Sequence, residues 1–304
     1  MSNKVAIFML FGQSNATGHA MPMDEKDIIK EPLKNVWGLN REPNQSFDTE
    51  KLKFSGYTSF GMNLAETQDN TYSVANCLAR LWQDEIDSGN KAQLPDLYVI
   101  HISIGAQGLY GMWHPDRARK LIPGKLGDVD ISLYPFTVHI LKLLKKHLED
   151  CSLEPEFVGL HWRGGEEERN YGLDIVNLDL KNMYKRFFAG LREAIGYEVP
   201  ITLHRMPYVD AMMKEDPTGG HLKAMEYMND IFEQLANEQT KTTTFEPLNA
   251  PHYDPNAWDK NLFRWDLIHY TGKTNAWVAE EIFKEFKEKK KIIKKKHLGL
   301  HKMI

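Results

Sequence analysis

Short apolar segments alternate along the chain with longer segments whose apolar residues recur at helical spacing, and this alternation constrains the fold most strongly. Continuous apolar runs rich in β-branched and aromatic residues are typical of strands buried on both faces. Helices between such strands provide the right-handed crossovers that parallel strands need. The pattern therefore predicts a doubly wound, three-layer α/β/α sandwich. The expected strands are residues 5–11, 97–104, 157–162 and 201–204, with a weaker one at 242–245, and the expected helices are 72–87, 133–148, 176–195, 222–236 and 275–286.

The chain reads as a single domain, residues 1–290, followed by a Lys-rich tail, residues 291–304. Its 304 residues are enough for one large core, and the sequence contains no internal repeat or low-complexity linker. Three long polar stretches interrupt the alternation, at about 19–70, 105–131 and 246–264. Long loops in a compact domain are commonly functional, so we expect these stretches to build the rim of a binding site.

Charge is distributed unevenly along the chain. The net charge is −4, but residues 284–304 hold nine Lys and two Glu, a net of +7, so the rest of the chain carries −11. An acidic body argues against an enzyme that binds polyanions. The Lys-rich run at 289–296 has the composition of a nucleic-acid or anionic-lipid contact, or of the solvated end of a last helix. We expect the second, and hence neither nucleic acid nor membrane as a partner.

The sequence carries no indication of a membrane span or of a disulfide framework. The longest apolar run near the start, residues 5–11, is far shorter than the roughly 20 residues that cross a bilayer. We therefore expect a cytoplasmic protein, although a secreted chain trimmed of its leader would look the same. Cys77 and Cys151 lie in no zinc-binding pattern, so they are interpreted as ordinary thiols, and no metal site is expected.

The first apolar segment leads directly into Gly12, Gln13, Ser14 and Asn15. A glycine at the strand end permits a sharp turn, and the serine after it can present its hydroxyl at the top of the sheet. If a helix begins there, its amides face the same space and can hold an oxyanion. The alternative interpretation is an ordinary helix start in which Ser14 or Asn15 is the N-cap. The segment differs from the G-x-S-x-G elbow because Ala16 replaces the second glycine.

A second candidate pair, Asp266 and His269, stands three residues apart just before the last expected helix. A serine nucleophile needs a base, and the base needs a group that orients it. At this spacing the carboxylate can hold imidazole Nδ1–H and leave Nε2 facing Ser14. The alternative is a capping Asp266 or Thr271 beside a packed histidine. Another Asp/His pair, in 252–254, is ranked lower because no final-helix pattern follows it.

These residues together resemble the SGNH (GDSL-like) hydrolase superfamily. Gly-Gln-Ser-Asn at 12–15 and Asp266-x-x-His269 are similar to its blocks I and V. The branch that begins Gly-Gln-Ser-Asn contains sialate O-acetylesterases and carbohydrate esterase family 6. Residues 159–166 resemble its Gly-x-x-Trp-x-Gln-Gly-Glu block, and residues 103–108 resemble the glycine-rich block II, more weakly.

The resemblance implies a flavodoxin-like sandwich with a five-stranded parallel sheet, and a serine esterase acting on an acylated, small-molecule carbohydrate, with acetyl as the expected acyl group. It implies that Ser14 is the nucleophile, His269 the base and Asp266 the orienting acid. The oxyanion donors would be the amides of Ser14 and Gly105, with Gly108 as the alternative to Gly105. It implies no metal and no organic cofactor.

One position departs from the family pattern. Gly164 stands where the family has a Gln whose side-chain amide completes the oxyanion hole. Loss of one such donor typically costs about 2.7–4 kcal/mol. Arg163 and Gln107 are the nearest candidates for a replacement, and the cluster at 166–169 reads either as a salt-bridged helix start or as Glu166 stiffening the site from behind. The residues we expect to bind substrate are Gln13, Asn15, Gln107, Arg163 and Glu166.

Aromatic side chains near these segments suit a carbohydrate pocket because flat rings stack on sugars, but for each one taken alone we expect packing in the core or at the rim. They are Trp113, Trp162, Trp258 and Trp265, whereas His101 and His161 lie inside apolar segments and are expected to be core residues. The missing Gln motivates a rival interpretation, a non-catalytic carbohydrate-binding protein on a decayed esterase fold. A second rival is an acyltransferase, in which a sugar hydroxyl replaces water.

Overall fold

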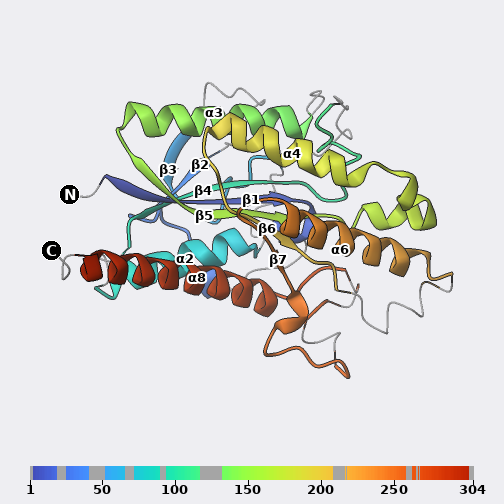
Figure 1. The fold of residues 1–304 in the computed structure, drawn as a ribbon. Helices are drawn as coiled ribbons and strands as arrows, with labels where there is room; N and C mark the ends of the chain where they lie inside the picture. Colours follow the sequence, from blue (N-terminus) through green and yellow to red (C-terminus); the bar gives the residue numbers. More distant parts are fainter. Residues whose placement is uncertain are drawn as a thin grey trace.

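The computed structural model describes residues 3–18, 25–40, 52–65, 72–89, 94–116, 132–207, 216, 218–257, 262–264, 266 and 268–300. Within these residues, seven strands form one sheet in the order β3-β2-β4-β1-β5-β6-β7 (Figure 1). All neighbouring strands are parallel except β2 and β3, which are antiparallel. The strands are β1 (Lys4–Gly12), β2 (Val36–Asn40), β3 (Lys53–Gly56), β4 (Asp96–Ser103), β5 (Glu154–Arg163), β6 (Ile201–His204) and β7 (Thr242–Phe245).

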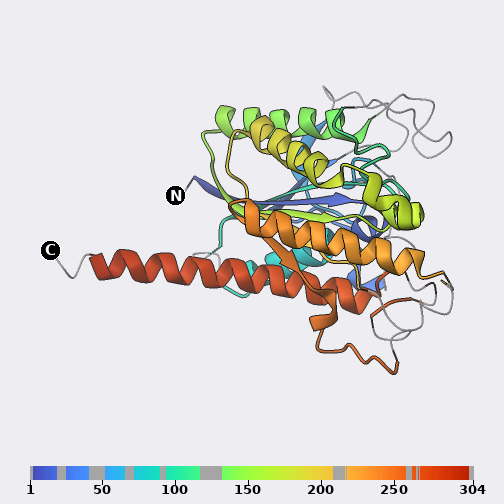
Figure 2. The same cartoon turned by 45° about the vertical axis from the view of Figure 1, so that its right-hand side comes forward.

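Helices cover both faces of the sheet, so the expected three-layer sandwich is confirmed (Figures 1 and 2). On one face lie α2 (Val74–Asp87) and α8 (Gly272–Leu300), which pack against each other. The other face is covered by α3 (Leu133–Asp150), α4 (Leu180–Ile195) and α6 (Gly220–Glu238). The short helices are α1 (Ser14–Thr17), η1 (Glu25–Asp27), η4 (Glu168–Asn177) and η5 (Pro247–Asn249).

The central strand β1 explains why the sheet is buried on both sides. Successive side chains of a strand point to opposite faces, so a continuous apolar run supplies two cores at once. In β1 one set of side chains packs with α3, α4 and α6, and the alternate set packs with α2 and α8. The first set is Val5, Ile7, Met9 and Phe11, and the second is Ala6, Phe8 and Leu10.

The sheet has more strands than the five expected. The weak candidate at 242–245 is confirmed as β7, and β2 and β3 are two strands that the sequence did not predict. Both lie within the polar stretch 19–70. β3 carries one large apolar residue, Phe54, and pairs antiparallel with β2 at the edge of the sheet. An edge strand needs little apolar character, so the sequence gives it a weak signal.

Two of the expected helix boundaries also differ. The segment 176–195 is divided, because η4 ends at Asn177 and α4 begins at Leu180. The last helix, α8, continues to Leu300, so the expected boundary between domain and tail at residue 290 does not coincide with a break in the helix.

Three adjacent strands bring three loops to one edge of the sheet. β1 lies between β4 and β5, and its last residue, Gly12, is in register with Ser103 of β4 and with Arg163 of β5. Because the strands are parallel, their carboxyl ends coincide, and ligands of open α/β sheets bind at such an edge. The loops after Gly12, Ser103 and Arg163 are therefore the first place to look for a site.

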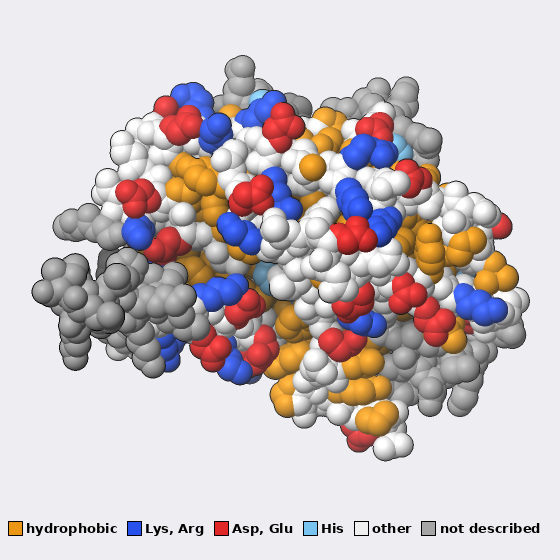
Figure 3. All heavy atoms as spheres, viewed as in Figure 1, with side chains coloured by type: hydrophobic (Ala, Val, Ile, Leu, Met, Phe, Trp, Pro, Cys, Tyr) orange, Lys and Arg blue, Asp and Glu red, His pale blue; other side chains and the backbone are white. Residues whose placement is uncertain are grey.

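Acidic and basic side chains are intermixed over the face of the molecule drawn in Figure 3. In the described part of the chain, no helix has both the length and the apolar composition required to cross a lipid bilayer.

Candidate active site

The turn after β1 requires glycine at position 12. Its φ of +147° is rarely adopted by residues with side chains, and a Cβ there would collide with the backbone carbonyl of Arg163. The next residue, Gln13, donates its backbone N–H to that same carbonyl at 3.0 Å, which ties the turn to β5. α1 begins directly afterwards, so Ser14 is fixed at the carboxyl edge of the sheet.

Asp266 and His269 form a hydrogen-bonded pair just before α8. His269 Nδ1 lies 2.8 Å from Asp266 Oδ2, and Asp266 Oδ1 accepts the backbone N–H groups of Ile268 at 3.1 Å and His269 at 2.9 Å. Partial burial raises the pKa of the Asp266 carboxyl, but these hydrogen bonds from His269 and Ile268 outweigh it, and the pKa lies below its usual value. An ionised carboxylate at Nδ1 favours the tautomer in which Nδ1 carries the proton and Nε2 is the acceptor.

A cavity of about 210 Å³ joins the two segments. Ser14, Gly105 and His269 all line it, so the expected nucleophile, one expected oxyanion donor and the expected base share one space. Beside them is Ala106, whose φ of +56° is unusual for a residue with a side chain. The other described lining residues are Gln13, Glu166, Glu167, Arg169 and Ile268.

Asn15 connects the serine turn to the histidine loop. Its side chain is buried and donates to Glu166 Oε1 at 2.7 Å and to the backbone carbonyl of Ile268 at 3.1 Å, while its Oδ1 accepts the N–H of Tyr270 at 3.2 Å. Glu166 also accepts a hydrogen bond from Gln13 Nε2. These contacts, which we call the Asn15 clamp, fix α1, the end of β5 and the loop before α8 relative to one another.

Arg163, expected to contact substrate, is buried and is not among the described residues that line the cavity. Only 2% of its surface is exposed. Its Nη1 donates to Asn275 Oδ1 at 2.8 Å, and its guanidinium lies 4.8 Å from the centre of the Tyr270 ring. Burial lowers the pKa of Arg163, and nearby Tyr270 and Glu166 oppose that shift. The side chain therefore braces α8 against β5.

The other expected substrate contacts are divided between the cavity and its support. Gln13 and Glu166 line the cavity, whereas Asn15 and Gln107 are not among its described lining residues. The buried side chains of Gln13 and Asn15 are oriented by Glu166, so the interpretation of Glu166 as a support for the site agrees with its contacts.

Gly164 has no room for a side chain. A Cβ at this position would lie 2.9 Å from the ring of Trp162, closer than real Cβ contacts allow. Trp162 itself is fully buried in the core beside Trp113, whose Nε1 donates to the Gly12 carbonyl at 3.1 Å. The burial of Trp113 and Trp162 agrees with the expected packing role, and Trp258 and Trp265 lie outside the described residues.

The cluster at 166–169 contains the start of η4, but one of its carboxylates is buried, and no ion pair with another described residue involves its side chains. Glu168 is 1% exposed, and its carboxylate accepts the backbone N–H of Leu109. Burial raises the pKa of Glu168 to about 7, although backbone hydrogen bonds from Leu109 and Tyr110 oppose that shift. Glu168 thus holds the loop that carries Gly105.

Arg169 was not predicted as a site residue. It lines the cavity and, within the described residues, makes no hydrogen bond or ion pair. Its position three residues after the Gly-Gly-Glu segment could have indicated a site residue. We instead interpreted its charge as part of a surface ion pair.

The remaining histidines and acids of the described residues have other surroundings. His101 and His161 are buried core residues, as expected, and His252 Nε2 lies 3.1 Å from Thr274 Oγ1. Among the residues that the structure describes, no cluster of three or more His, Cys, Asp or Glu is arranged to hold a metal ion.

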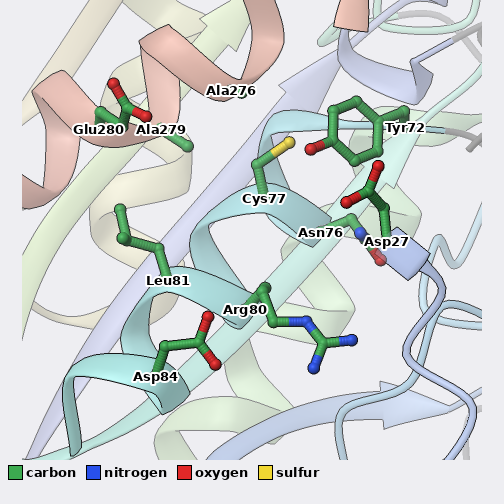
Figure 4. Close-up of a pocket in the computed structure, with 10 residues that line it drawn as sticks. All are labelled: Asp27, Tyr72, Asn76, Cys77, Arg80, Leu81, Asp84, Ala276, Ala279 and Glu280. Carbon is green, nitrogen blue, oxygen red and sulfur yellow. The ribbon is translucent and has the colours of Figure 1, made fainter. Parts of the chain in front are cut away.

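A second cavity, of about 150 Å³, lies between α2 and α8 (Figure 4). Its lining includes Cys77, Arg80 and Glu280 but none of the expected site residues. Burial raises the pKa of the Cys77 thiol to about 12, so this sulfur is a poor nucleophile. The chemistry therefore points to the cavity at the carboxyl edge of the sheet.

Comparison with known proteins gives a match in structure. A scan of protein-family models and a search of curated proteins gave no match to the sequence. Among solved structures, NanS aligns with a TM-score of 0.57 at 13% identity, over 95% of this chain and 99% of NanS. This likeness shows the fold, in agreement with the expected three-layer α/β/α sandwich.

Weaker matches are carbohydrate esterases by name. XAC1771, a carbohydrate acetylesterase from Xanthomonas citri, aligns with a TM-score of 0.39 at 11% identity, over 89% of this chain and 53% of that chain. A family 3 carbohydrate esterase from Clostridium thermocellum aligns with a TM-score of 0.35 at 12% identity, over 93% of this chain and 98% of that chain.

Proposed function

We propose that the protein is a serine esterase that removes a small acyl group, with acetyl as the first candidate, from a carbohydrate alcohol. The observation that carries this proposal is the shared cavity of Ser14, Gly105 and His269, with Asp266 hydrogen-bonded to the far side of the imidazole. The sequence resemblance to carbohydrate acetylesterases supports the substrate class.

In the proposed mechanism, Ser14 Oγ attacks the ester carbonyl while His269 Nε2 takes the hydroxyl proton. The carbonyl electron pair moves onto its oxygen, where the amides of Ser14 and Gly105 donate hydrogen bonds. Collapse of this intermediate reforms the carbonyl and expels the sugar alkoxide, which takes the proton from His269. Water then repeats the cycle on the acyl-enzyme and releases the acid.

The ionised Asp266 has two roles in this sequence. Through Nδ1 it holds the imidazole in the required tautomer and orientation, and it stabilises the imidazolium formed after proton transfer. Two backbone N–H groups donate to its other oxygen, which keeps the carboxylate ionised and in place.

Turnover of p-nitrophenyl acetate by the wild type and by Ser14→Ala tests the proposal. We expect Ser14→Ala to lose at least about 10⁴-fold in kcat, because no other group forms the acyl-enzyme. A fluorophosphonate probe should label the wild type at Ser14 and leave the variant unlabelled. Equal turnover by the two proteins would refute the esterase mechanism.

One observation favours the rival, a carbohydrate-binding protein. The absence of a side chain at Gly164, with Trp162 against that position, removes a family oxyanion donor. This rival predicts that the folded wild type binds acetylated sugars but gives no labelling and no turnover.

A further inference from the structure

The cavity needs another source of positive charge for catalysis to proceed. Position 164 supplies no side-chain donor, and the indole of Trp162 blocks the space that a longer side chain would need. Two carboxylates, Glu166 and Glu167, line the same cavity. A negative oxyanion that forms beside them is repelled unless a nearby cation compensates.

Arg169 is the only Lys or Arg among the described residues that line this cavity. It is half-buried, and within those residues no carboxylate or carbonyl occupies its N–H groups. It also lines a small adjoining cavity together with Asn15, Glu166 and Ile268, so its side chain runs alongside the Asn15 clamp. A guanidinium with free donors in a partly enclosed space is suited to binding an anion.

The backbone of Arg169 is fixed relative to the expected oxyanion loop. The residue before it, Glu168, is buried and accepts the N–H of Leu109 in the loop that carries Gly105. A side chain at Gly108 would collide with that carboxylate, which shows how closely the two segments pack. The backbone of Arg169 is therefore held in place at the rim of the cavity.

We propose that Arg169 is a catalytic residue that donates an N–H hydrogen bond to the oxyanion, in place of the side chain that Gly164 lacks. The inference rests on the proposed esterase function. When Ser14 Oγ bonds to the carbonyl carbon, the carbonyl electron pair moves to oxygen, and the guanidinium stabilises it without giving up a proton. When the intermediate collapses, the electron pair returns to the carbonyl and the sugar oxygen leaves with the proton from His269.

The test is steady-state kinetics with p-nitrophenyl acetate, a substrate that has no carboxylate of its own. We expect Arg169→Ala to lower kcat by about 10²–10³-fold with KM little changed, because the lost hydrogen bond exists only in the transition state. Arg169→Lys keeps the charge and should retain more activity than Arg169→Gln. Guanidinium chloride, added well below denaturing concentrations, should restore part of the activity of Arg169→Ala.

Arg80→Ala is the matched control, since Arg80 is a half-buried arginine that lines the other cavity, between α2 and α8. It should leave kcat unchanged. Thermal melting identifies any variant that fails to fold. If Arg169→Ala does not fold, the proposal is tested by whether Arg169→Lys has a higher kcat than Arg169→Gln.

Three results would overturn the proposal. Wild-type kcat in Arg169→Ala, with Ser14→Ala inactive, would remove Arg169 from catalysis and leave the esterase function intact. An effect confined to KM would make Arg169 a ground-state binding residue. Full activity in Ser14→Ala would end the esterase mechanism, and this inference with it.

Discussion

Two combinations of serine and histidine in the described part of the chain differ in burial and in partners: the contacting pair Ser103 and His101, and the cavity-lining residues Ser14 and His269. Ser103 Oγ lies 2.9 Å from His101 Nε2, and both side chains are buried beneath α1. Ser14 and His269 line an open cavity instead. His269 is hydrogen-bonded to a carboxylate, whereas among the described residues no carboxylate bonds to His101.

The buried pair has a structural role. His101 Nε2 lies 3.0 Å from the Ala16 carbonyl, and Ser103 Oγ accepts from Thr17 Oγ1 at 2.9 Å and from Asn63 Nδ2 at 3.0 Å. The network supports α1, and thereby Ser14, from below. Proximity of a hydroxyl to an imidazole is thus insufficient for a nucleophile, which also needs access to substrate and a base whose cationic form is stabilised.

The largest expected effect comes from removing the carboxylate that distinguishes the two pairs. Asp266→Asn should lower kcat on p-nitrophenyl acetate by about 10⁴-fold, because an amide favours the wrong imidazole tautomer and leaves the imidazolium unpaired. Asp254→Asn, in an exposed loop position before α8, is the control and should keep wild-type kcat. A modest effect of Asp266→Asn would mean that the Asp266 carboxylate is not what makes His269 an effective base.

The next effect concerns the pH dependence of stability. Burial lowers the pKa of His101 to about 4, although its contact with the Ala16 carbonyl opposes the shift. The unfolded chain binds a proton near pH 6.5, so between pH 6.5 and 4 it binds more protons than the native state. This histidine alone should therefore destabilise the protein by roughly 3 kcal/mol as the pH falls through that range.

Urea unfolding of the wild type and of His101→Gln at pH 7.5 and pH 4 measures how much His101 contributes to the change in unfolding free energy with pH. Glutamine keeps an N–H donor for the Ala16 carbonyl and does not titrate. The free energy of unfolding of the wild type, relative to the variant, should drop on acidification by the amount given above. A constant difference would show that His101 carries the same charge in both states.

The smallest effect is expected from Ser103→Ala. Loss of its hydroxyl removes the buried acceptor of the hydrogen bonds from Thr17 Oγ1 and Asn63 Nδ2, at a cost of about 1–3 kcal/mol in unfolding free energy. Ser14 should still react with a fluorophosphonate probe. Ser88→Ala, at the exposed end of α2, should change stability by less than about 0.5 kcal/mol. Loss of labelling in folded Ser103→Ala would contradict the division of roles between the two pairs.

The sequence predicted the parts of the fold that long periodic segments encode. A continuous apolar run such as β1 indicates a strand buried on both faces, and apolar residues at helical spacing, as in α2, indicate an amphipathic helix. The three-layer sandwich was predicted from the alternation of these two patterns. β3 was missed because a short strand at the edge of the sheet has little apolar character, and β2 because its apolar residues lie in a run of only five residues inside a long polar stretch.

For the site, the sequence predicted which segments line the cavity, but it did not predict where individual side chains of those segments lie. Gly12, Ser14 and His269 stand at element ends, where local pattern is informative, and their catalytic roles remain predictions. The burial of Arg163 could not be predicted because its partners, Asn275 and Tyr270, are more than 100 residues away in the chain. Arg169 was overlooked because the sequence of a charged cluster does not show which of its side chains form ion pairs. That depends on their surroundings in the folded chain.

The Asn15 clamp has a consequence for the timing of activity during synthesis. It joins residues near the start of the chain to the carbonyl of Ile268 and the N–H of Tyr270, so the turn that carries Ser14 is fixed against this loop only after the loop has been translated. A ribosome-bound chain arrested before this loop would carry an assembled first strand and no working centre. Onset of turnover should therefore report that the late C-terminal segment has emerged and docked.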